Sequence, residues 1–488
     1  MIKQKSVSRG FLWKLFERFG VSGVQFVLQI ILARILEPEH YGALSIMIIF
    51  TSLANVFVQN GFNTALVQNK DVDEDDYSSV FWVSLAIASA LYVLIFFASP
   101  LIGAFYKLPE IVTPMRVLAL MVIPGALNSV QIAKISREMD FKKIFYSNVG
   151  AVITSGAVGI ALAYLGGGLW ALVAQSLLNV VVACIVMRAT VKLKLRFHCD
   201  LSRIKILFGF GWKLLVSSLI DTLYQDLRSL VIGKKYDSGT LGYYNRGKQF
   251  PQFIINAVNG AVQSVLLPVM SANQDDKAQV KEMMRRSIML SAFIIFPMMA
   301  GLAGVAKPLV SLLLTDKWLP CVPYMQIYCF TLAFWPVHTS NLQAINAVGR
   351  SDVFLKLEII KKSYGIVALI IAVFCFDSPI AIAMTGVFTT FISCFVNAYP
   401  NKKLINYSYF EQMKDVLPSL AISIIMLVTV LLVGTLPLSN LAILLLQVLV
   451  GIIVYFLLSA VLRVRSFVIM TSLLKQFVKK NKSSEDVK

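Results

Sequence analysis

Long apolar runs separated by short polar connections dominate the sequence. A transmembrane helix needs about 20 mostly apolar residues, and about fourteen runs of that kind can be drawn. The predicted spans are 16–36, 41–61, 78–102, 113–133, 144–165, 169–187, 208–232, 242–270, 287–314, 321–347, 354–376, 378–398, 416–436 and 440–462. The pattern predicts an all-α integral membrane protein with about 14 transmembrane helices.

The connections between these spans alternate between basic and nearly uncharged. Most of the 45 Lys and Arg residues fall in the N-terminal arm, in every second connection and in the C-terminal tail. Cytoplasmic loops of membrane proteins carry an excess of Lys and Arg. We therefore expect a multi-pass protein of the bacterial inner (cytoplasmic) membrane with both termini in the cytoplasm. One cytoplasmic connection, 70–76, is acidic instead, but acidic residues contribute little to orientation.

Composition narrows the class further. Apolar residues make up 57% of the chain and charged residues 15%, which leaves no room for a soluble catalytic domain. The net charge of +19 is spread over many segments that flank spans. It therefore indicates membrane topology and contact with anionic lipid headgroups, and no nucleic-acid partner.

Cysteine and histidine give no sign of a metal site or a disulfide framework. The six cysteines include no CxxC pair, and the three histidines lie far apart in the sequence. We expect no metal and no cofactor.

A short internal repeat divides the chain. Residues 10–15 (GFLWKL) recur as 209–214 (GFGWKL), and Asn60-Gly61 recurs as Asn259-Gly260 at the same shift of 199. Tyr41-Gly42 has a near counterpart in Leu241-Gly242. An even number of helices separates the copies, so they are parallel repeats, which suits a transporter with a central cavity.

The repeat predicts two six-helix lobes plus two C-terminal helices. The predicted parts are an N-lobe at 1–187, a cytoplasmic linker at 188–207, a C-lobe at 208–400, two further helices within 415–462, and a basic cytoplasmic tail at 463–488.

Polar residues recur at helical spacing inside several spans. Arg18, Gln25 and Gln29, for example, lie within about 40° of one another on a helix. Ionisable groups at membrane depth usually face the bundle interior or a hydrated cavity. The candidates for substrate contact are Arg18, Gln25, Gln29, Asn55, Gln59, Lys213, Asp221, Tyr224, Arg228, Arg246, Lys248, Gln252 and Asn256.

A purely structural interpretation stays open for these residues. Asn and Gln can hold helices together, and arginines such as Arg228 and Arg246 can extend to the membrane interface. Asp221 and Arg228, seven residues apart, form an internal charge pair as readily as a substrate contact. Residues 242–249 (GYYNRGKQ) approach a phosphate-binding P-loop, but Gln249 replaces the Ser or Thr that contacts magnesium.

Several ordered segments carry a family resemblance over roughly residues 6–410. They are 61–68 (GFNTALVQ), 80–82 (VFW), 116–120 (RVLAL), 137–141 (REMDF), 169–173 (LWALV) and the stretch from 208 to 244. The chain resembles the bacterial polysaccharide transporter family, the Wzx-type flippases of the WzxC kind. These belong to the MOP superfamily together with the MATE multidrug exporters and lipid II flippases.

This resemblance implies a MATE-like, two-lobed transporter that is not an enzyme. Its expected substrate is an oligosaccharide repeat unit linked to undecaprenyl pyrophosphate, moved across the membrane by alternating access for O-antigen, capsule or exopolysaccharide synthesis. Cavity cations would bind the pyrophosphate; Arg18, Lys213, Arg228, Arg246 and Lys248 are the candidates. A polysaccharide polymerase is a candidate partner.

Two alternatives differ in class. A MATE-like, ion-coupled exporter of small molecules would favour acidic groups in its cavity, whereas here cations outnumber Asp221 and Asp226. A membrane polymerase or ligase would need an extended outer loop with catalytic residues, and the outer loops are short. The sequence leaves open the sugar, the coupling ion (H+ or Na+) and the oligomeric state.

Overall fold

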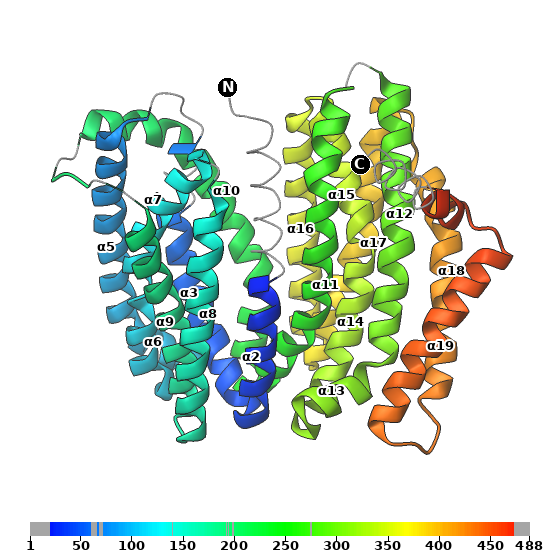
Figure 1. The fold of residues 1–488 in the computed structure, drawn as a ribbon, viewed down its shortest axis with the longest axis horizontal. Helices are drawn as coiled ribbons and strands as arrows, with labels where there is room; N and C mark the ends of the chain where they lie inside the picture. The colour runs from blue at the N-terminus through cyan, green and yellow to red at the C-terminus, as the bar shows by residue number, and fades with distance from the viewer. Residues whose placement is uncertain are drawn as a thin grey trace, which may run out of the picture. The chain divides into compact units, whose positions relative to one another are not determined.

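The computed structural model describes residues 20–59, 66–67, 72–138, 140–191, 193, 195–197, 200–273 and 276–472. All regular secondary structure in these ranges is helical (Figure 1). The chain divides into two compact units, residues 1–242 and residues 243–488. The predicted all-α class is therefore confirmed for the described residues.

Unit 1 is a bundle of long helices. Its elements are α2 (Ser22–Ile35), α3 (Pro38–Gln59), α5 (Glu74–Tyr106), η2 (Pro109–Ile111), α6 (Val112–Ala119), α7 (Val122–Glu138), α8 (Phe141–Tyr164), α9 (Leu169–Thr190) and α10 (Leu201–Lys235). Helix α8 packs along α9 and α2, α5 packs on α7, and α10 packs on α3 and α5. Helix α11 (Ser238–Ser271) begins in this unit and continues into the next.

Unit 2 contains the rest of α11 and a second set of helices. They are α12 (Lys277–Gly304), α13 (Ala306–Leu314), η3 (Asp316–Cys321), α14 (Val322–Ala333), α15 (Trp335–Ala347), α16 (Ser351–Cys375), α17 (Pro379–Leu404), α18 (Tyr409–Val433) and α19 (Asn440–Val461). Helix α12 packs along α18, and α18 packs on α19. The Tyr455 hydroxyl donates to the carbonyl oxygen of Phe293 over 2.7 Å, which ties α19 to α12.

Each of the fourteen predicted spans overlaps a helix, but three of them are broken. The spans 113–133, 287–314 and 321–347 correspond to the pairs α6–α7, α12–α13 and α14–α15. Pro124, Pro308 and Pro336 each lie in the first turn of the second helix of a pair. Proline is tolerated there because its missing N–H has no partner in the first turn.

Nine helical segments in the described ranges are long and apolar enough to cross a membrane. The protein is therefore a multi-pass membrane protein, while the count of fourteen spans stays a prediction. Helix α16 shows why the count by length and composition is lower than fourteen. It is long enough to cross a membrane, but its apolar part begins only after Glu358, Lys361 and Lys362.

Helix ends repeat along the chain with a spacing of 200 residues. Helix α2 ends at Ile35 and α10 at Lys235, and α3 begins at Pro38 and α11 at Ser238. The two helix starts touch reciprocally within unit 1. A Cβ atom on Gly42 would lie 1.7 Å from the carbonyl oxygen of Ser238, and one on Gly242 would lie 2.1 Å from that of Pro38. Glycine is required at both positions for the backbones to approach this closely.

The compact units meet at Gly242 and Tyr243, one helix later than the boundary drawn from the repeat. Helix α10 packs on α3 and α5, although the repeat assigns it to the second lobe. The predicted lobe boundaries follow the sequence repeat. As boundaries of the two parts that move against each other during transport, they stay a prediction.

The acidic segment at the start of α5 contacts the basic connection between α9 and α10. Asp73 caps α5 by accepting from the backbone N–H groups of Asp75 and Asp76. Arg203 donates to Asp73 over 2.7 Å and to Asp76 over 3.2 Å, and Arg196 donates to Asp75 over 3.1 Å. The Arg203 guanidinium lowers the pKa of Asp73 to about 2, helped by the backbone N–H of Asp76.

Trp82 extends this contact with its ring. Its Nε1–H donates to the carbonyl oxygen of Arg196 over 2.8 Å, and its ring stacks on Phe197 with centroids 4.9 Å apart. The linker clamp consists of Asp73, Asp75, Asp76 and Trp82 on the α5 side and Arg196, Phe197 and Arg203 on the other. It explains why one predicted cytoplasmic connection is acidic.

Buried amides join three helices of unit 2. Asn341 of α15 donates to Gln412 of α18 over 2.7 Å and accepts from Asn401 of α17 over 2.7 Å. The Gln412 amide also donates back to Asn341 over 3.0 Å. These side chains are fully buried, so here amides hold helices together, as one of the sequence interpretations allows.

Candidate functional site

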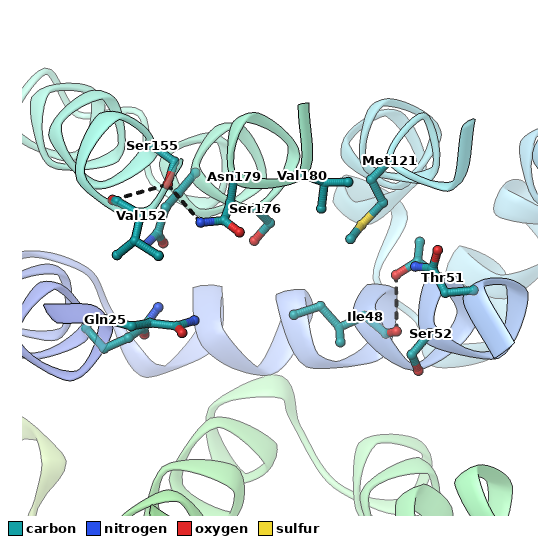
Figure 2. Close-up of a pocket in the computed structure, with 13 residues that line it drawn as sticks. Gln25, Ile48, Thr51, Ser52, Met121, Val152, Ser155, Ser176, Asn179 and Val180 are labelled. Carbon is teal, nitrogen blue, oxygen red and sulfur yellow. Dashed lines mark hydrogen bonds between the residues drawn. The ribbon is translucent and has the colours of Figure 1, made fainter. Parts of the chain in front are cut away.

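Unit 1 contains a pocket of about 230 Å³ between its helices. Figure 2 shows side chains reaching it from two sides: Gln25 and Ile48 on one, and Ser155, Ser176, Asn179 and Val180 on the other. The lining residues are Gln25, Gln29, Ile48, Thr51, Ser52, Asn55, Met121, Val152, Ser155, Gln175, Ser176, Asn179 and Val180. Four of its polar side chains, Gln25, Gln29, Asn55 and Gln175, end in amide groups without an internal partner, and we call it the amide pocket.

Helical spacing brings these side chains to the pocket. Gln25 and Gln29 are four residues apart on α2, and Gln175 and Asn179 are four apart on α9, so each pair occupies one face of its helix. Asn55 lies one turn after Thr51 on α3. The pocket thus collects amides from the consecutive helices α2 and α3 and from α9, which lies more than 100 residues later in the sequence.

Two glycines make room for two of the amides. A Cβ atom on Gly125 would lie 2.9 Å from Oδ1 of Asn55, and one on Gly159 would lie 3.0 Å from Cβ of Gln175. Any larger residue at these positions would push the amide side chain toward the cavity. The glycines therefore fix where Asn55 and Gln175 stand.

The hydroxyls of Thr51, Ser52 and Ser155 form hydrogen bonds inside the protein, whereas four of the amides do not. Thr51 and Ser52 donate to carbonyl oxygens of their own helix, and Asn179 donates to Ser155 over 3.3 Å (Figure 2). Within the described part of the chain, the side-chain amides of Gln25, Gln29, Asn55 and Gln175 form no hydrogen bond. Their donors and acceptors are available to whatever fills the pocket.

Unit 2 contains a second pocket of about 280 Å³ along one face of α11. It is lined by Asn245, Lys248, Gln249, Gln252, Phe253 and Asn256. Gln252 donates to Asn256 over 2.9 Å, and the Nζ atom of Lys248 lies 6.0 Å from the centre of the Tyr328 ring. Asn245, Gln249, Gln252 and Asn256, spaced by four, three and four residues, therefore form one polar face of α11.

Arg246 is absent from the lining of this second pocket. Its side chain is only 5% exposed, and its guanidinium carbon lies 5.0 Å from the centre of the Trp318 ring. It donates to Oε1 of Gln249 over 2.6 Å. Because Arg246 is two residues from Lys248, the two side chains point about 200° apart around the helix. Arg246 therefore contacts Gln249 from the side that faces away from Lys248.

The remaining candidates lie elsewhere. Asp221 accepts from Gln225 of the same helix over 2.8 Å, and Asp221, Tyr224 and Arg228 are all half-buried on α10. Gln59, the last residue of α3, is exposed and lines neither pocket. Two candidates cannot be placed: Arg18 lies outside the described residues, and the side chain of Lys213 is not among those described.

Sequence reasoning missed the contribution of α8 and α9. Gln175 and Asn179 show the same four-residue spacing of amides that marks the helix at 242–270, within an otherwise apolar span. Ser155 gives no such signal, because serine is common in helix packing. In the described ranges, no three His, Cys, Asp or Glu side chains form a possible metal site.

A family of polysaccharide biosynthesis proteins matches residues 31–323, which is more than half of the chain. The chain belongs to this family. The resemblance drawn from the sequence motifs is therefore confirmed.

Characterised members of the family align over most of their length. The chain is 26% identical over 358 residues to the succinoglycan biosynthesis transport protein ExoT of Rhizobium meliloti (strain 1021), covering 72% of this chain and 71% of that protein. It is 23% identical over 376 residues to the lipopolysaccharide biosynthesis protein WzxC of Escherichia coli (strain K12), covering 76% and 75%. It is also 24% identical over 354 residues to the teichuronic acid biosynthesis protein TuaB of Bacillus subtilis (strain 168), covering 71% and 72%.

Solved structures show which fold this family member has. The lipid II flippase MurJ in an inward closed conformation matches with a TM-score of 0.74 at 15% identity, covering 93% of this chain and 98% of that one. An inward-facing MATE family transporter of the MOP superfamily matches with a TM-score of 0.61 at 16% identity, covering 80% and 98%. The chain therefore shares the fold of these transporters.

Proposed function

We propose that this protein is a flippase that moves lipid-linked oligosaccharide repeat units across the bacterial cytoplasmic membrane for surface polysaccharide synthesis. The observation that carries the proposal is the amide pocket: unengaged polar groups inside a bundle of apolar helices, in a member of a polysaccharide biosynthesis family. ExoT and WzxC, which are named for polysaccharide synthesis, support the substrate class.

These features meet the physical requirements of such transport. A sugar hydroxyl or a phosphate in hydrocarbon without a hydrogen-bonding partner costs several kcal/mol. A pocket that offers amides to the head group removes most of that cost, while the lipid tail stays in the bilayer. Rocking of two helical lobes then exposes the site to each side in turn.

The head group also carries a pyrophosphate, which needs cations. Lys248 lines the second pocket, and Arg18, Lys213 and Arg228 stay candidates from the sequence. We assign to these residues the binding of undecaprenyl pyrophosphate, with a proton or Na+ gradient as the driving force and both chain ends in the cytoplasm. A polysaccharide polymerase is the partner that would take up the product.

A small-molecule exporter with the MATE fold is the main alternative. Exporters of cationic drugs would favour acidic groups in the binding cavity. Neither pocket has an Asp or Glu among its described lining residues. The observed linings therefore favour a polyhydroxylated substrate.

The leaflet position of the lipid-linked oligosaccharide in a deletion strain tests this function. A large lectin added to spheroplasts reaches only repeat units on the outer face. We expect complete repeat units to accumulate out of its reach and to become accessible when the gene is restored. Repeat units that are already accessible but unpolymerised would indicate an enzyme instead, and no accumulation would indicate a drug exporter.

A further inference from the structure

We propose that the amide pocket is a subsite for one uncharged sugar ring of the repeat unit, separate from the site that binds the pyrophosphate. The inference rests on the proposed function and adds the chemical class of the group that this pocket takes. It is carried by the lining, the hydrogen-bonding state of the amides and the size of the cavity.

The described lining offers no charged partner to a ligand. All thirteen described lining residues are neutral, and none of them is aromatic. A phosphate or carboxylate taken out of water requires charged partners, which this lining lacks. A hydroxyl group both donates and accepts one hydrogen bond, and each side-chain amide offers both functions.

The size of the pocket limits the part of the ligand that it encloses to a small group. Its volume of about 230 Å³ is smaller than the roughly 300–1,000 Å³ of pockets that enclose drug-sized molecules. A whole repeat unit of several sugars does not fit, whereas a single ring does. The apolar residues Ile48, Met121, Val152 and Val180 would contact the C–H faces of that ring.

The amides are held in place yet left without partners. Gln175 is 8% exposed and packs on Gly159, and Asn55 packs on Gly125. A polar group that is largely buried without a partner is costly, so these amides indicate an occupant. Sites built to bind hydroxyls discriminate strongly against analogues that lack them, so the pocket would select the sugar.

Gln175→Leu tests this, since leucine keeps the apolar part of the side chain and removes the amide. Two probes would be titrated onto the purified full-length protein: the water-soluble oligosaccharide released from the host's own repeat unit, and undecaprenyl pyrophosphate without sugar. We expect the affinity for the oligosaccharide to fall about three- to tenfold, because up to two neutral hydrogen bonds are lost. The affinity for undecaprenyl pyrophosphate should stay unchanged.

Gln279→Leu is the matched control, because Gln279 is exposed at the start of α12 and lines neither pocket. If Gln175→Leu does not fold, the half-buried Gln29 provides a second variant, Gln29→Leu, with the same expected result. An unchanged affinity for the oligosaccharide, or an equal loss for both probes, would overturn the subsite but leave the flippase standing. Wild-type protein that binds neither probe and moves no lipid-linked oligosaccharide in liposomes would overturn the proposed function itself.

Discussion

At Gly42, a side chain of one carbon would place that atom 1.7 Å from the carbonyl oxygen of Ser238. Backbone atoms cannot move aside as the end of a flexible side chain can. We expect Gly42→Ala to separate the starts of α3 and α11 and to destabilise the protein by about 1–3 kcal/mol or more, as overpacking of cores does. Thermal unfolding in detergent measures this as a lower melting temperature.

Gly150→Ala is the control for that substitution. Gly150 lies within α8, and a Cβ atom there would have no described atom within 4 Å. Alanine inside a helix is favoured over glycine by about 0.5–1 kcal/mol, so this variant should be as stable as the wild type or slightly more stable. Equal melting temperatures for the two variants would contradict the contact between the helix starts.

Single residues also show how far sequence reasoning about the candidate site can reach. Gln25, Gln29 and Asn55 line one pocket, as polar residues at helical spacing in apolar spans predict, and their contact with substrate stays a prediction. Arg246 could not be assigned, because spacing gives a helical face but not the neighbour it meets. In the structure that neighbour is Trp318, 72 positions later.

The linker clamp connects two elements through ion pairs, of which the one between Arg203 and Asp73 is exposed. The folded pKa of Asp73, about 2, lies below its ordinary value of 3.8. The carboxylate therefore stabilises the clamp at neutral pH, and that contribution is lost only as the pH falls from about 3.8 towards 2. We expect the clamp to be insensitive to pH between about 5 and 8 but weakened by salt.

Asp73→Asn removes the charge but keeps a good helix cap, since Asn and Asp cap helices about equally well. Trypsin cleavage after Arg196 or Arg203 should become faster by at most about fivefold, because exposed ion pairs are individually weak. Glu282→Gln, which removes an exposed pair with Arg286 inside α12, should leave the rate of that cleavage unchanged. A rate for Asp73→Asn equal to that of the wild type, at low salt, would mean that the contacts of Asp75, Asp76 and Trp82 hold the linker without the charge of Asp73.

The buried amides of unit 2 predict a different response. Asn341→Ala would remove the side-chain partner of Asn401 and Gln412, while Asn401 keeps its bond to the carbonyl oxygen of residue 341. Hydrogen bonds between membrane helices contribute about 0.6 kcal/mol on average and up to about 1.7, and we expect a loss of stability in that range. The melting temperature should fall, while Gln279→Ala, which truncates an exposed side chain at the start of α12, should change it little; equal shifts would argue against the network.

At the level of elements, hydropathy located the helices but not their interruptions. The break between α14 and α15 is the single apolar residue Phe334, so an average over a window does not register it. Pro336 marked the position, but proline also occurs inside intact helices here, at Pro100 and Pro297. Local sequence therefore gives the possible break points, and packing decides among them.

For the molecule as a whole, the two pockets predict separable effects on transport. Lys248 is the only charged residue among those described in the lining of the second pocket. Lys248→Gln should lower the amount of surface polysaccharide about tenfold or more, because hydrogen bonds to charged groups are the stronger ones. Lys277→Gln, at an exposed position at the start of α12, should leave it unchanged, and a normal level in Lys248→Gln would exclude Lys248 from binding the pyrophosphate.

The class of the molecule was predictable because charge and hydropathy alternate over its whole length. The boundary between the two compact units could not be predicted from the repeat. The repeat assigns α10 to the second half, whereas α10 packs on α3 and α5. A sequence repeat shows which segments correspond to each other. A helix that belongs to one copy of the repeat can still pack on helices of the other copy.

The packing of α10 has a consequence for synthesis of the chain. The ribosome delivers residues 201–235 after every other long helix of unit 1, and at about 5–20 residues per second this stretch takes roughly 2–7 s to make. Until it arrives, α3 and α5 lack the helix that packs on them. Slow codons in the stretch that encodes the linker would lengthen this interval, so synonymous changes there should affect the yield of folded protein more than the same changes near the C-terminus.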